Sequence, residues 1–155
     1  MSGVIVTKAM DVPSKHWEEH EGFAYDRRIL IPKGAAQQCQ VALYSIPPGK
    51  SAFPYHHHVK NEECYYILSG TGTLRTPEGE QTVSAGHFVF FPADETGAHK
   101  MTNPSQTEPL VYLDFDTVND LEVCFYPDSG KIGVWGKSTD QLYKTSDQAE
   151  YYDGE

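Results

Sequence analysis

Three side chains with the chemistry of metal ligands stand close together in the middle of the chain. His56 and His58 are separated by one residue, and Glu63 follows after a short polar break. Residues two apart in a strand point to the same face, so both imidazoles can project inward while His57 points outward. Glu63 stands at the start of the next expected strand, and pairing of the two strands can bring its side chain to the two imidazoles. Two imidazoles and a carboxylate are a ligand set suited to Fe, Mn, Ni, Co or Zn.

The alternative is that the three consecutive histidines form a solvated loop or a fragment of a purification tag. A tag would be terminal and longer, whereas this run lies between strand signals in the middle of the chain. The surrounding pattern is also longer than His-x-His, because it reads His56-x-His58-x4-Glu63-x6-Gly70. The longer pattern favours a metal site.

This pattern resembles the first motif of the cupin superfamily, G-x5-H-x-H-x3,4-E-x6-G. The second motif, G-x5-P-x-G-x2-H-x3-N, has its counterpart in Gly86-x5-Pro92-x-Asp94-x4-His99-x3-Asn103. The resemblance covers about residues 38–115. It implies one divalent transition metal ion (Fe, Mn, Zn or Ni) held by His56, His58, Glu63 and His99, with coordination positions left open for water or substrate.

The chain departs from the family pattern in its turns. Six residues rather than five separate Gly49 from His56, and Asp94 stands where the second motif usually has glycine. The gap from Asp94 to His99 is two residues longer than usual. These differences change loops and leave the ligand types intact, while Asn103 matches a position that supports a turn.

The resemblance implies an all-β fold, a double-stranded β-helix (cupin or jelly-roll barrel). Composition agrees, because 13 Gly and 10 Pro punctuate short segments rich in aromatic and β-branched residues. Strands are expected at 40–46, 65–68, 71–75, 81–83, 87–91, 99–102, 110–115, 123–126 and 132–135. The strand at 110–115 alternates poorly and is expected to be buried on both faces.

With 155 residues the chain is the size of one domain. We expect an N-terminal arm over 1–37, the barrel core over 38–117, and a C-terminal extension over 118–155 that packs on the barrel and ends in an acidic tail from about 145. Residues 4–7 are expected to form a strand. Residues 14–19 and 140–144 are expected to form helical turns.

Twelve Lys and Arg against 22 Asp and Glu give a net charge of -10. This balance disfavours nucleic acid and anionic membranes, which need clustered positive charge. Three widely spaced cysteines and the lack of a long apolar segment near Met1 predict a cytoplasmic location with reduced thiols. By analogy with the family we expect a homodimer, in which the arm around residues 4–6 could add a strand to its partner's sheet.

Residues that share inward parity with the ligands are candidates for a substrate pocket: Tyr65, Ile67, Met101 and Phe53. Lysines and arginines at 50, 60, 75 and 100 could hold an anionic group, although such side chains are more often solvated. The acids Asp114 and Asp116, with Glu122, are interpreted as solvated charge. No catalytic side chain is assigned.

The leading hypothesis is a metal-dependent enzyme for a small organic molecule, with isomerisation or enolisation as the reaction. Small cupins that resemble this chain include sugar-phosphate isomerases. The alternatives are an Fe(II)-dependent dioxygenase and a non-enzymatic binding or sensor module that holds a small ligand without turnover.

Overall fold

Antiparallel strands carry the fold. The computed structural model describes residues 3–155, and the all-β class is confirmed. The strands are β1 (Lys15–His20), β2 (Phe23–Ile29), β3 (Cys39–Ile46), β4 (His57–His58), β5 (Glu63–Ser69), β6 (Thr71–Thr76), β7 (Gly79–Ser84), β8 (Phe88–Phe91), β9 (Lys100–Thr102), β10 (Leu110–Thr117), β11 (Leu121–Tyr126), β12 (Lys131–Gly136) and β13 (Thr139–Lys144). The described residues also form three short 3-10 helices: η1 (Ala9–Asp11) precedes β1, and η2 (Glu95–Gly97) and η3 (Pro127–Ser129) lie between strands.

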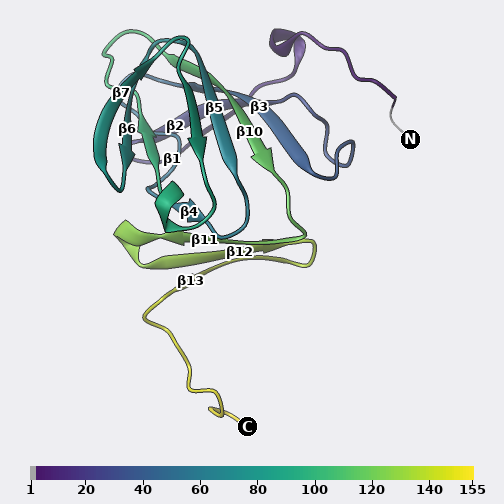
Figure 1. Ribbon diagram of the computed structural model, residues 1–155, viewed down its shortest axis with the longest axis vertical. Coiled ribbons are helices and arrows are strands. Elements are labelled where there is room, and N and C mark those ends of the chain that lie inside the picture. The colour runs from purple at the N-terminus through teal and green to yellow at the C-terminus, as the bar shows by residue number, and fades with distance from the viewer. Residues whose placement is uncertain (1–2) are drawn as a thin grey trace.

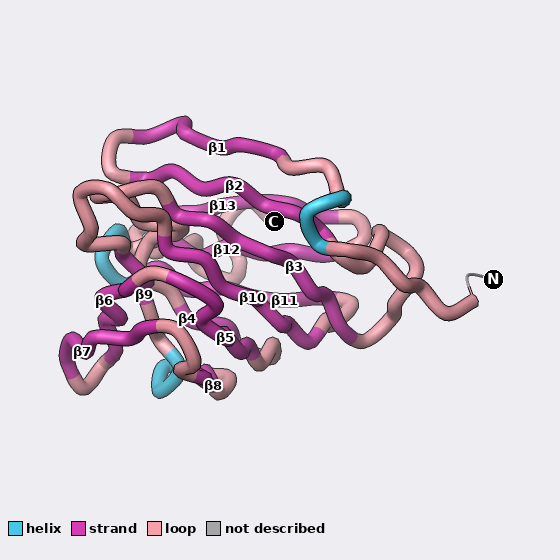
Figure 2. Tube along the Cα trace, turned by 90° about the horizontal axis from the view of Figure 1, so that it is seen from above, coloured by secondary structure: helices cyan, strands magenta, loops and turns pink. Residues whose placement is uncertain are grey.

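The strands form a double-stranded β-helix whose larger sheet has six strands in the order β1-β2-β3-β10-β5-β8. Figure 2 shows these six strands side by side. A three-stranded sheet, β7-β6-β9, completes the barrel wall, and the sheet β13-β12-β11-β4 lies across one end (Figure 1). Residues 121–136 therefore close the end of the barrel at which the histidines of β4 lie.

The barrel is filled by a cluster of aromatic and aliphatic side chains that alternate with outward residues on β3, β5 and β10. Tyr44 and Tyr112 stack with ring centroids 5.4 Å apart, and Tyr65 lies 4.5 Å from Tyr112. The buried members are Ala42, Tyr44, Ile46, Ala52, Tyr65, Ile67, Leu74, Val83, Phe91, Met101, Leu110 and Tyr112. Burial of an aliphatic or Phe side chain contributes about 1.5–3 kcal/mol, so this cluster holds the two sheets together.

The expected helical turn over 14–19 is wrong, because this segment forms strand β1. It pairs with β2 in a hairpin, and Trp17 stacks on its cross-strand partner Tyr25 at 5.0 Å. Cross-strand aromatic pairs stabilise a ladder. The helical prediction rested on residues 14–19 alone and could not take Tyr25 into account. Residues 15–29, inside the expected arm, are thus part of the six-stranded sheet.

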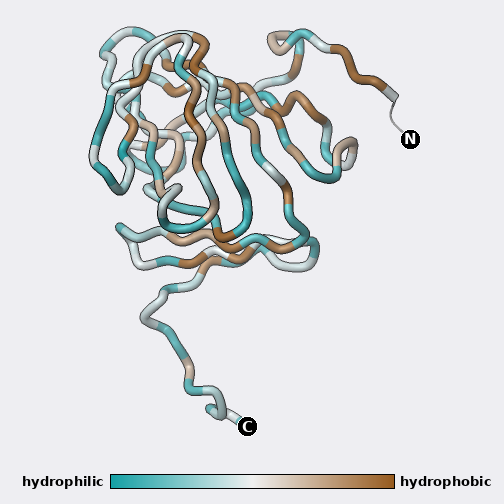
Figure 3. Tube along the Cα trace, in the orientation of Figure 1, coloured by the Kyte–Doolittle hydropathy of each residue, from teal (hydrophilic) through white to brown (hydrophobic). Residues whose placement is uncertain are grey.

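Two other local predictions differ from the structure. Residues 140–144 belong to strand β13, which pairs along its whole length with β12, so the helical turn expected there is wrong. Residues 4–7 have no regular structure, and Val4 and Val6 are exposed. Figure 3 shows a hydrophobic stretch of chain near the N-terminus. Met1 and Ser2, also part of the expected arm, lie outside the described residues. Among residues 3–155, no helix is long and apolar enough to cross a membrane.

Asn103 fixes the turn that follows β9. Its fully buried amide nitrogen donates to the carbonyl oxygens of Ile46 and Glu108 at 2.8 and 2.9 Å, and its oxygen accepts from the N–H of Ser105 at 3.0 Å. Asn103 therefore has the turn-supporting role that the motif implied. Gly70 has φ 82°, and a Cβ there would lie 2.4 Å from the carbonyl oxygen of Pro109, so this motif position requires glycine.

Asp94 has backbone angles that only glycine adopts easily, with φ 74° and ψ −176°. Its N–H donates to the carbonyl of His58 at 2.6 Å, which ties the loop before His99 to β4. The departure from the family motif at this position therefore stores backbone strain between two candidate ligands.

Replacing Asp94 with glycine is expected to stabilise the protein by about 1 kcal/mol, because relief of strain exceeds the entropy that glycine adds to the unfolded chain. For a chain of this size that corresponds to a rise in Tm of roughly 2–4 °C by calorimetry. Asp94→Ala is the matched control and keeps the strain, so its Tm should not rise. A lower Tm for Asp94→Gly would contradict this account.

Candidate metal centre

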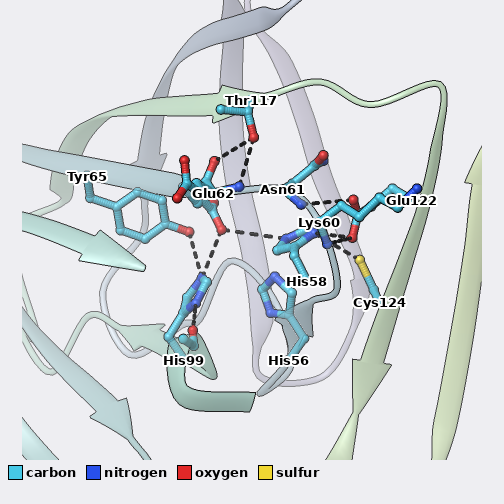
Figure 4. Close-up of polar contacts among 12 residues, drawn as sticks. His56, His58, Lys60, Asn61, Glu62, Tyr65, His99, Thr117, Glu122 and Cys124 are labelled. Carbon is cyan, nitrogen blue, oxygen red and sulfur yellow. Dashed lines mark hydrogen bonds and ion pairs between the residues drawn. The ribbon is translucent and has the colours of Figure 1, made fainter. Parts of the chain in front are cut away.

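Backbone pairing brings the predicted ligands together at the closed end of the barrel. His56 and His99 form an isolated antiparallel bridge in which each N–H donates to the other's carbonyl, at 3.1 and 2.9 Å. His58 lies on β4, which pairs with β11, and Glu63 is the first residue of β5. The imidazoles of His56, His58 and His99 lie close together (Figure 4), and Glu63 Oε2 approaches those of His58 and His99. His57 points away from this group and stacks on Phe125.

The imidazoles present their Nε2 atoms to the centre. Nδ1 of His56 lies 2.8 Å from the carbonyl oxygen of Pro54, and Nδ1 of His99 lies 2.9 Å from that of Gly97. A carbonyl oxygen only accepts, so each ring carries a hydrogen on Nδ1, which leaves Nε2 of the neutral ring as an acceptor. Such a second hydrogen bond is the usual way in which a protein fixes the tautomer of a ligating histidine.

Glu63 completes the set. Its Oε2 lies 3.2 Å from Nε2 of His99 and 3.6 Å from Nε2 of His58, yet this buried oxygen makes no hydrogen bond. One ligand atom from each of His56, His58 and Glu63 falls within 4.8 Å of the others. Ligands about 2.1 Å from a metal lie roughly 3 Å apart when adjacent, so the spacing fits one ion. The lone pairs of the Glu63 oxygen and of the imidazole nitrogens repel one another at this distance, and a cation bound between them would remove that repulsion.

Burial and neighbouring groups favour the metal-binding protonation states of His56, His58 and Glu63. Burial, with the nearby charge of His99, lowers the pKa of His56 to about 3, and burial also lowers the pKa of His58. Burial alone would raise the pKa of Glu63, but the imidazoles, His99 first, bring it below its usual range. Neutral imidazoles and an ionised carboxylate are the forms that bind a metal.

Glu122 shapes the loop that connects two of the ligands. Its buried carboxylate accepts three backbone N–H groups, from Val59 at 2.8 Å, Lys60 at 3.1 Å and Asn61 at 2.9 Å (Figure 4). Two residues further along the same strand, β11, Cys124 Sγ lies 3.1 Å from Nδ1 of His58. Burial raises the pKa of Cys124 to about 12, so the thiol stays protonated beside the ring. Glu122 therefore fixes the loop after His58, and Cys124 contacts the His58 ring on the side opposite to Nε2.

Glu122→Ala is expected to weaken metal binding by about 10–100-fold, the usual effect of removing a partner that orients a ligand. The three amides lose their acceptor and the loop between His58 and Glu63 loosens. Affinity is measured by titrating chelator-stripped protein with Zn²⁺ in the presence of a competing indicator. Glu62→Ala is the control, since that exposed neighbour should leave affinity unchanged. Equal affinities in the two variants would remove Glu122 from this role.

A cavity of about 190 Å³ opens beside the candidate ligands. Its wall includes His56, His58 and Glu63, together with Tyr44, Phe53, Asn61, Asp114, Asp116, Cys124, Tyr126 and Trp135. At about 30 Å³ per water molecule the cavity holds on the order of six waters, or one small organic molecule. A larger groove of about 860 Å³ shares His58, Asn61, Asp116 and Trp135 with the cavity and leads outward past Arg27 and Lys33.

Asp114 and Asp116 were expected to be solvated charges, and this is wrong. Asp114 is 3% exposed with Oδ1 unpartnered, and both carboxyls reach within 4.8 Å of Glu63. Burial and the charge of Glu63 raise the pKa of Asp116 to about 8 and that of Asp114 well above its usual range. The sequence did contain a signal for this burial, because Asp114 is an acid at an inward position of a strand that was expected to be buried on both faces.

The predicted pocket residues have different places. Phe53 lines the cavity, while Ile67 and Met101 lie in the hydrophobic core, away from it. Tyr65 is also buried in the core, and its hydroxyl lies 3.3 Å from Nε2 of His99. Two of the basic candidates are used elsewhere on the surface, because Lys50 pairs with Glu18 and Arg75 with Asp128. Arg27, which sequence reasoning missed, lies on the groove instead.

Comparison with known proteins agrees with this architecture. A family profile described as the Cupin domain matches residues 42–116, which span the four candidate ligands. The chain belongs to the cupin superfamily. A comparison with curated protein sequences gives no significant match.

Solved structures resemble the chain over most of its length. A candidate sugar phosphate isomerase from Acidithiobacillus ferrooxidans is 28% identical, with a TM-score of 0.82 over 94% of this chain and 95% of that one. A sugar phosphate isomerase from Silicibacter pomeroyi is 22% identical, with a TM-score of 0.75 over 83% and 82%. A candidate oxalate decarboxylase from Thermotoga maritima is 23% identical, with a TM-score of 0.63 over 74% and 100%. The last two likenesses concern the fold alone.

Proposed function

We propose that this cupin is a metal-dependent enzyme that moves a proton on a small hydroxy-carbonyl compound, as in the interconversion of an aldose and a ketose. The observation that carries the proposal is the unpartnered Glu63 Oε2, which faces the Nε2 atoms of His58 and His99 beside a small cavity. His56, His58, His99 and Glu63 would hold one divalent transition metal ion, Fe, Mn, Zn or Ni. An ion bound there supplies a Lewis acid for a carbonyl or hydroxyl oxygen.

The remaining chemistry belongs to the carboxyls of β10. Asp114 and Asp116 line the cavity beside Glu63, where a carboxyl with a raised pKa can donate a proton to a substrate oxygen and, once ionised, accept one from a substrate carbon. Phe53 and Tyr126 add aromatic surface to the wall of the cavity. A neighbouring base favours isomerisation over oxygen-dependent cleavage, which would require only open positions on iron.

The groove beyond the cavity supports a phosphorylated substrate. Arg27 lies on it with a buried Nε that makes no hydrogen bond, and its guanidinium packs over the ring of Tyr44 at 5.4 Å. A guanidinium is well suited to phosphate oxygens. The similarity to the Acidithiobacillus protein, at 28% identity, agrees with this substrate class.

The first test is elemental analysis of protein purified without a histidine tag, compared with the double variant His56→Ala/His99→Ala. We expect about one metal ion per wild-type chain and almost none in the variant. Equal metal content in both would refute the metal centre. The variant should also lose the rise in Tm that added metal gives the wild type.

The second test is incorporation of deuterium from D₂O into a panel of free and phosphorylated aldoses and ketoses, followed by NMR. Asp116→Asn should reduce exchange by about 10²–10⁴-fold with metal content unchanged. Arg27→Gln should raise KM for phosphorylated compounds only. Exchange with no panel member, together with oxygen consumption by the iron form, would favour a dioxygenase; a ligand-dependent rise in Tm without turnover would favour a binding module.

A further inference from the structure

A second cavity lies between the β1–β2 hairpin and the segment of η3 that leads into β12. Its volume is about 520 Å³, which falls within the roughly 300–1,000 Å³ of pockets that bind small organic molecules. We call it the aromatic pocket, because four rings contribute to its wall: Trp17, Phe23, Tyr25 and Tyr55.

The aromatic pocket is separate from the cavity beside the candidate metal ligands. Residues 52–55 stand between the two. Ala52, Pro54 and Tyr55 line the aromatic pocket, whereas Phe53 lines the other cavity. All four candidate ligands lie outside the wall of the aromatic pocket. A ligand of this pocket would therefore bind without touching the metal centre, so the inference below does not depend on the proposed function.

The rings of the aromatic pocket are held in place by contacts within the chain. Trp17 stacks on Tyr25 with centroids 5.0 Å apart, and Tyr25 packs against Phe53 at 4.9 Å. The guanidinium of Arg75 lies 4.0 Å from the ring centroid of Tyr55, which is buried. Large, rigid aromatic walls favour a ligand with a flat apolar body, and a wall already ordered makes binding less costly.

The charged side chains give the pocket a positive balance. Lys100 and Lys131 line it, and within residues 3–155 neither of their ammonium groups is in an ion pair. Of the two acids in the wall, Asp128 accepts from Arg75 with both oxygens, at 2.6 and 2.9 Å, and Glu19 is exposed. Two unpaired cations in a chain of net charge -10 indicate an anionic ligand.

Aromatic rings position both ammonium groups. Nζ of Lys100 lies 5.2 Å from the ring centroid of Phe23, and Nζ of Lys131 lies 5.3 Å from that of Tyr126. A cation–π contact attracts an ammonium group without cancelling its charge, so both groups can still donate to an acceptor on a ligand. Because Phe23 is itself a wall ring, one of the two cations stands directly beside the apolar surface.

We propose that the aromatic pocket binds a small organic anion that carries a carboxylate on a planar aromatic ring. The ring packs against the aromatic wall, and the carboxylate accepts from Lys100 and Lys131. A neutral ring of the same shape lacks the acceptor for the two ammonium groups. A cationic ring would be repelled by them.

The two tryptophans of the chain make a specific test possible, because each lines a different cavity. Trp17 lines the aromatic pocket and Trp135 the cavity beside the candidate ligands. The full chain, labelled with ¹⁵N, is titrated with 2-naphthoate, and NMR follows the two indole N–H signals with and without added Zn²⁺. We expect a saturable shift of the Trp17 signal in both conditions, with a Kd of about 1 mM or tighter, as for a ligand of this size with ordinary efficiency. Trp135→Phe assigns the signals.

Matched compounds and variants test the two parts of the recognition. The wild type should bind neutral 2-naphthamide at least about fivefold more weakly than 2-naphthoate. Lys100→Met and Lys131→Met should each weaken binding of 2-naphthoate by about fivefold and leave 2-naphthamide unchanged, while Lys8→Met, at an exposed lysine outside the pocket, changes neither. Ser129→Phe fills the pocket and should abolish the Trp17 shift with both compounds.

The comparison of the two compounds needs no variant, and the ¹⁵N spectrum of each variant shows whether it folds. Equal affinity of the wild type for 2-naphthoate and 2-naphthamide would overturn the inference. So would the absence of a Trp17 shift at ten times the expected Kd. A shift confined to Trp135, or one that appears only with Zn²⁺, would place the ligand at the metal centre and would also contradict the proposal.

Discussion

Replacing Glu63 with glutamine is expected to weaken binding of a divalent transition metal ion by more than about 100-fold. Loss of a partner that merely orients a ligand costs 10–100-fold, and Glu63 would be a ligand itself. Its Oε2 is the atom on which His58 and His99 converge, at 3.6 and 3.2 Å. The amide has nearly the same shape but removes the negative charge that balances the ion.

His57→Ala is the matched control, because His57 lies between two candidate ligands yet stacks outward on Phe125. Affinities for Mn²⁺ and Zn²⁺ are measured on chelator-stripped protein against a competing indicator. The added metal should raise the Tm of the wild type and of His57→Ala, but not of Glu63→Gln. If Glu63→Gln binds as tightly as the wild type, or if His57→Ala loses metal equally, the assignment of the centre is wrong.

Gly97→Ala is expected to destabilise the protein by about 3 kcal/mol, a large effect for one methyl group. A Cβ at this position would lie 1.8 Å from the carbonyl oxygen of Pro92, and backbone atoms cannot yield as a side chain can. The carbonyl of Gly97 also accepts from Nδ1 of His99, so the displaced loop carries the ligand with it. Metal affinity should fall along with stability.

Calorimetry should show a decrease in Tm of roughly 6–12 °C for Gly97→Ala, from the scaling for chains of this size. Gly3→Ala is the control, since no heavy atom lies within 4 Å of a Cβ built there. Its Tm should stay within about 2 °C of the wild type. An unchanged Tm for Gly97→Ala would mean that the loop before His99 is far more adaptable than its geometry implies.

Local sequence signals were sufficient for most strands of the barrel. Alternation and turn residues predicted the strands around Tyr44, Ile67 and Phe90, because each is bounded by proline or glycine and has strong β propensity. They failed for β1, β2 and β13, and β1 and β13 are polar segments that are strands only because a neighbour pairs with them. Propensity is a local quantity, while a ladder partner is supplied by the whole fold.

The site divides in the same way. His56, His58 and Glu63 could be identified from spacing, since residue type and strand parity alone bring them together. The roles of Asp114, Glu122 and Cys124 depend on how β10 and β11 approach that group, which a single sequence does not specify. An acid in a strand is usually solvated, so only the observed burial of Asp114 and Glu122 distinguishes them from ordinary surface charge.

The sheet that closes the barrel end also sets an order of events during synthesis. Glu122 and Cys124, which hold the loop after His58, lie more than sixty residues later in the chain. Domains form progressively as the chain emerges at about 5–20 residues per second, so His56 and His58 appear seconds before the residues that orient them. A metal centre formed by these residues would therefore be complete only after β11 has left the ribosome.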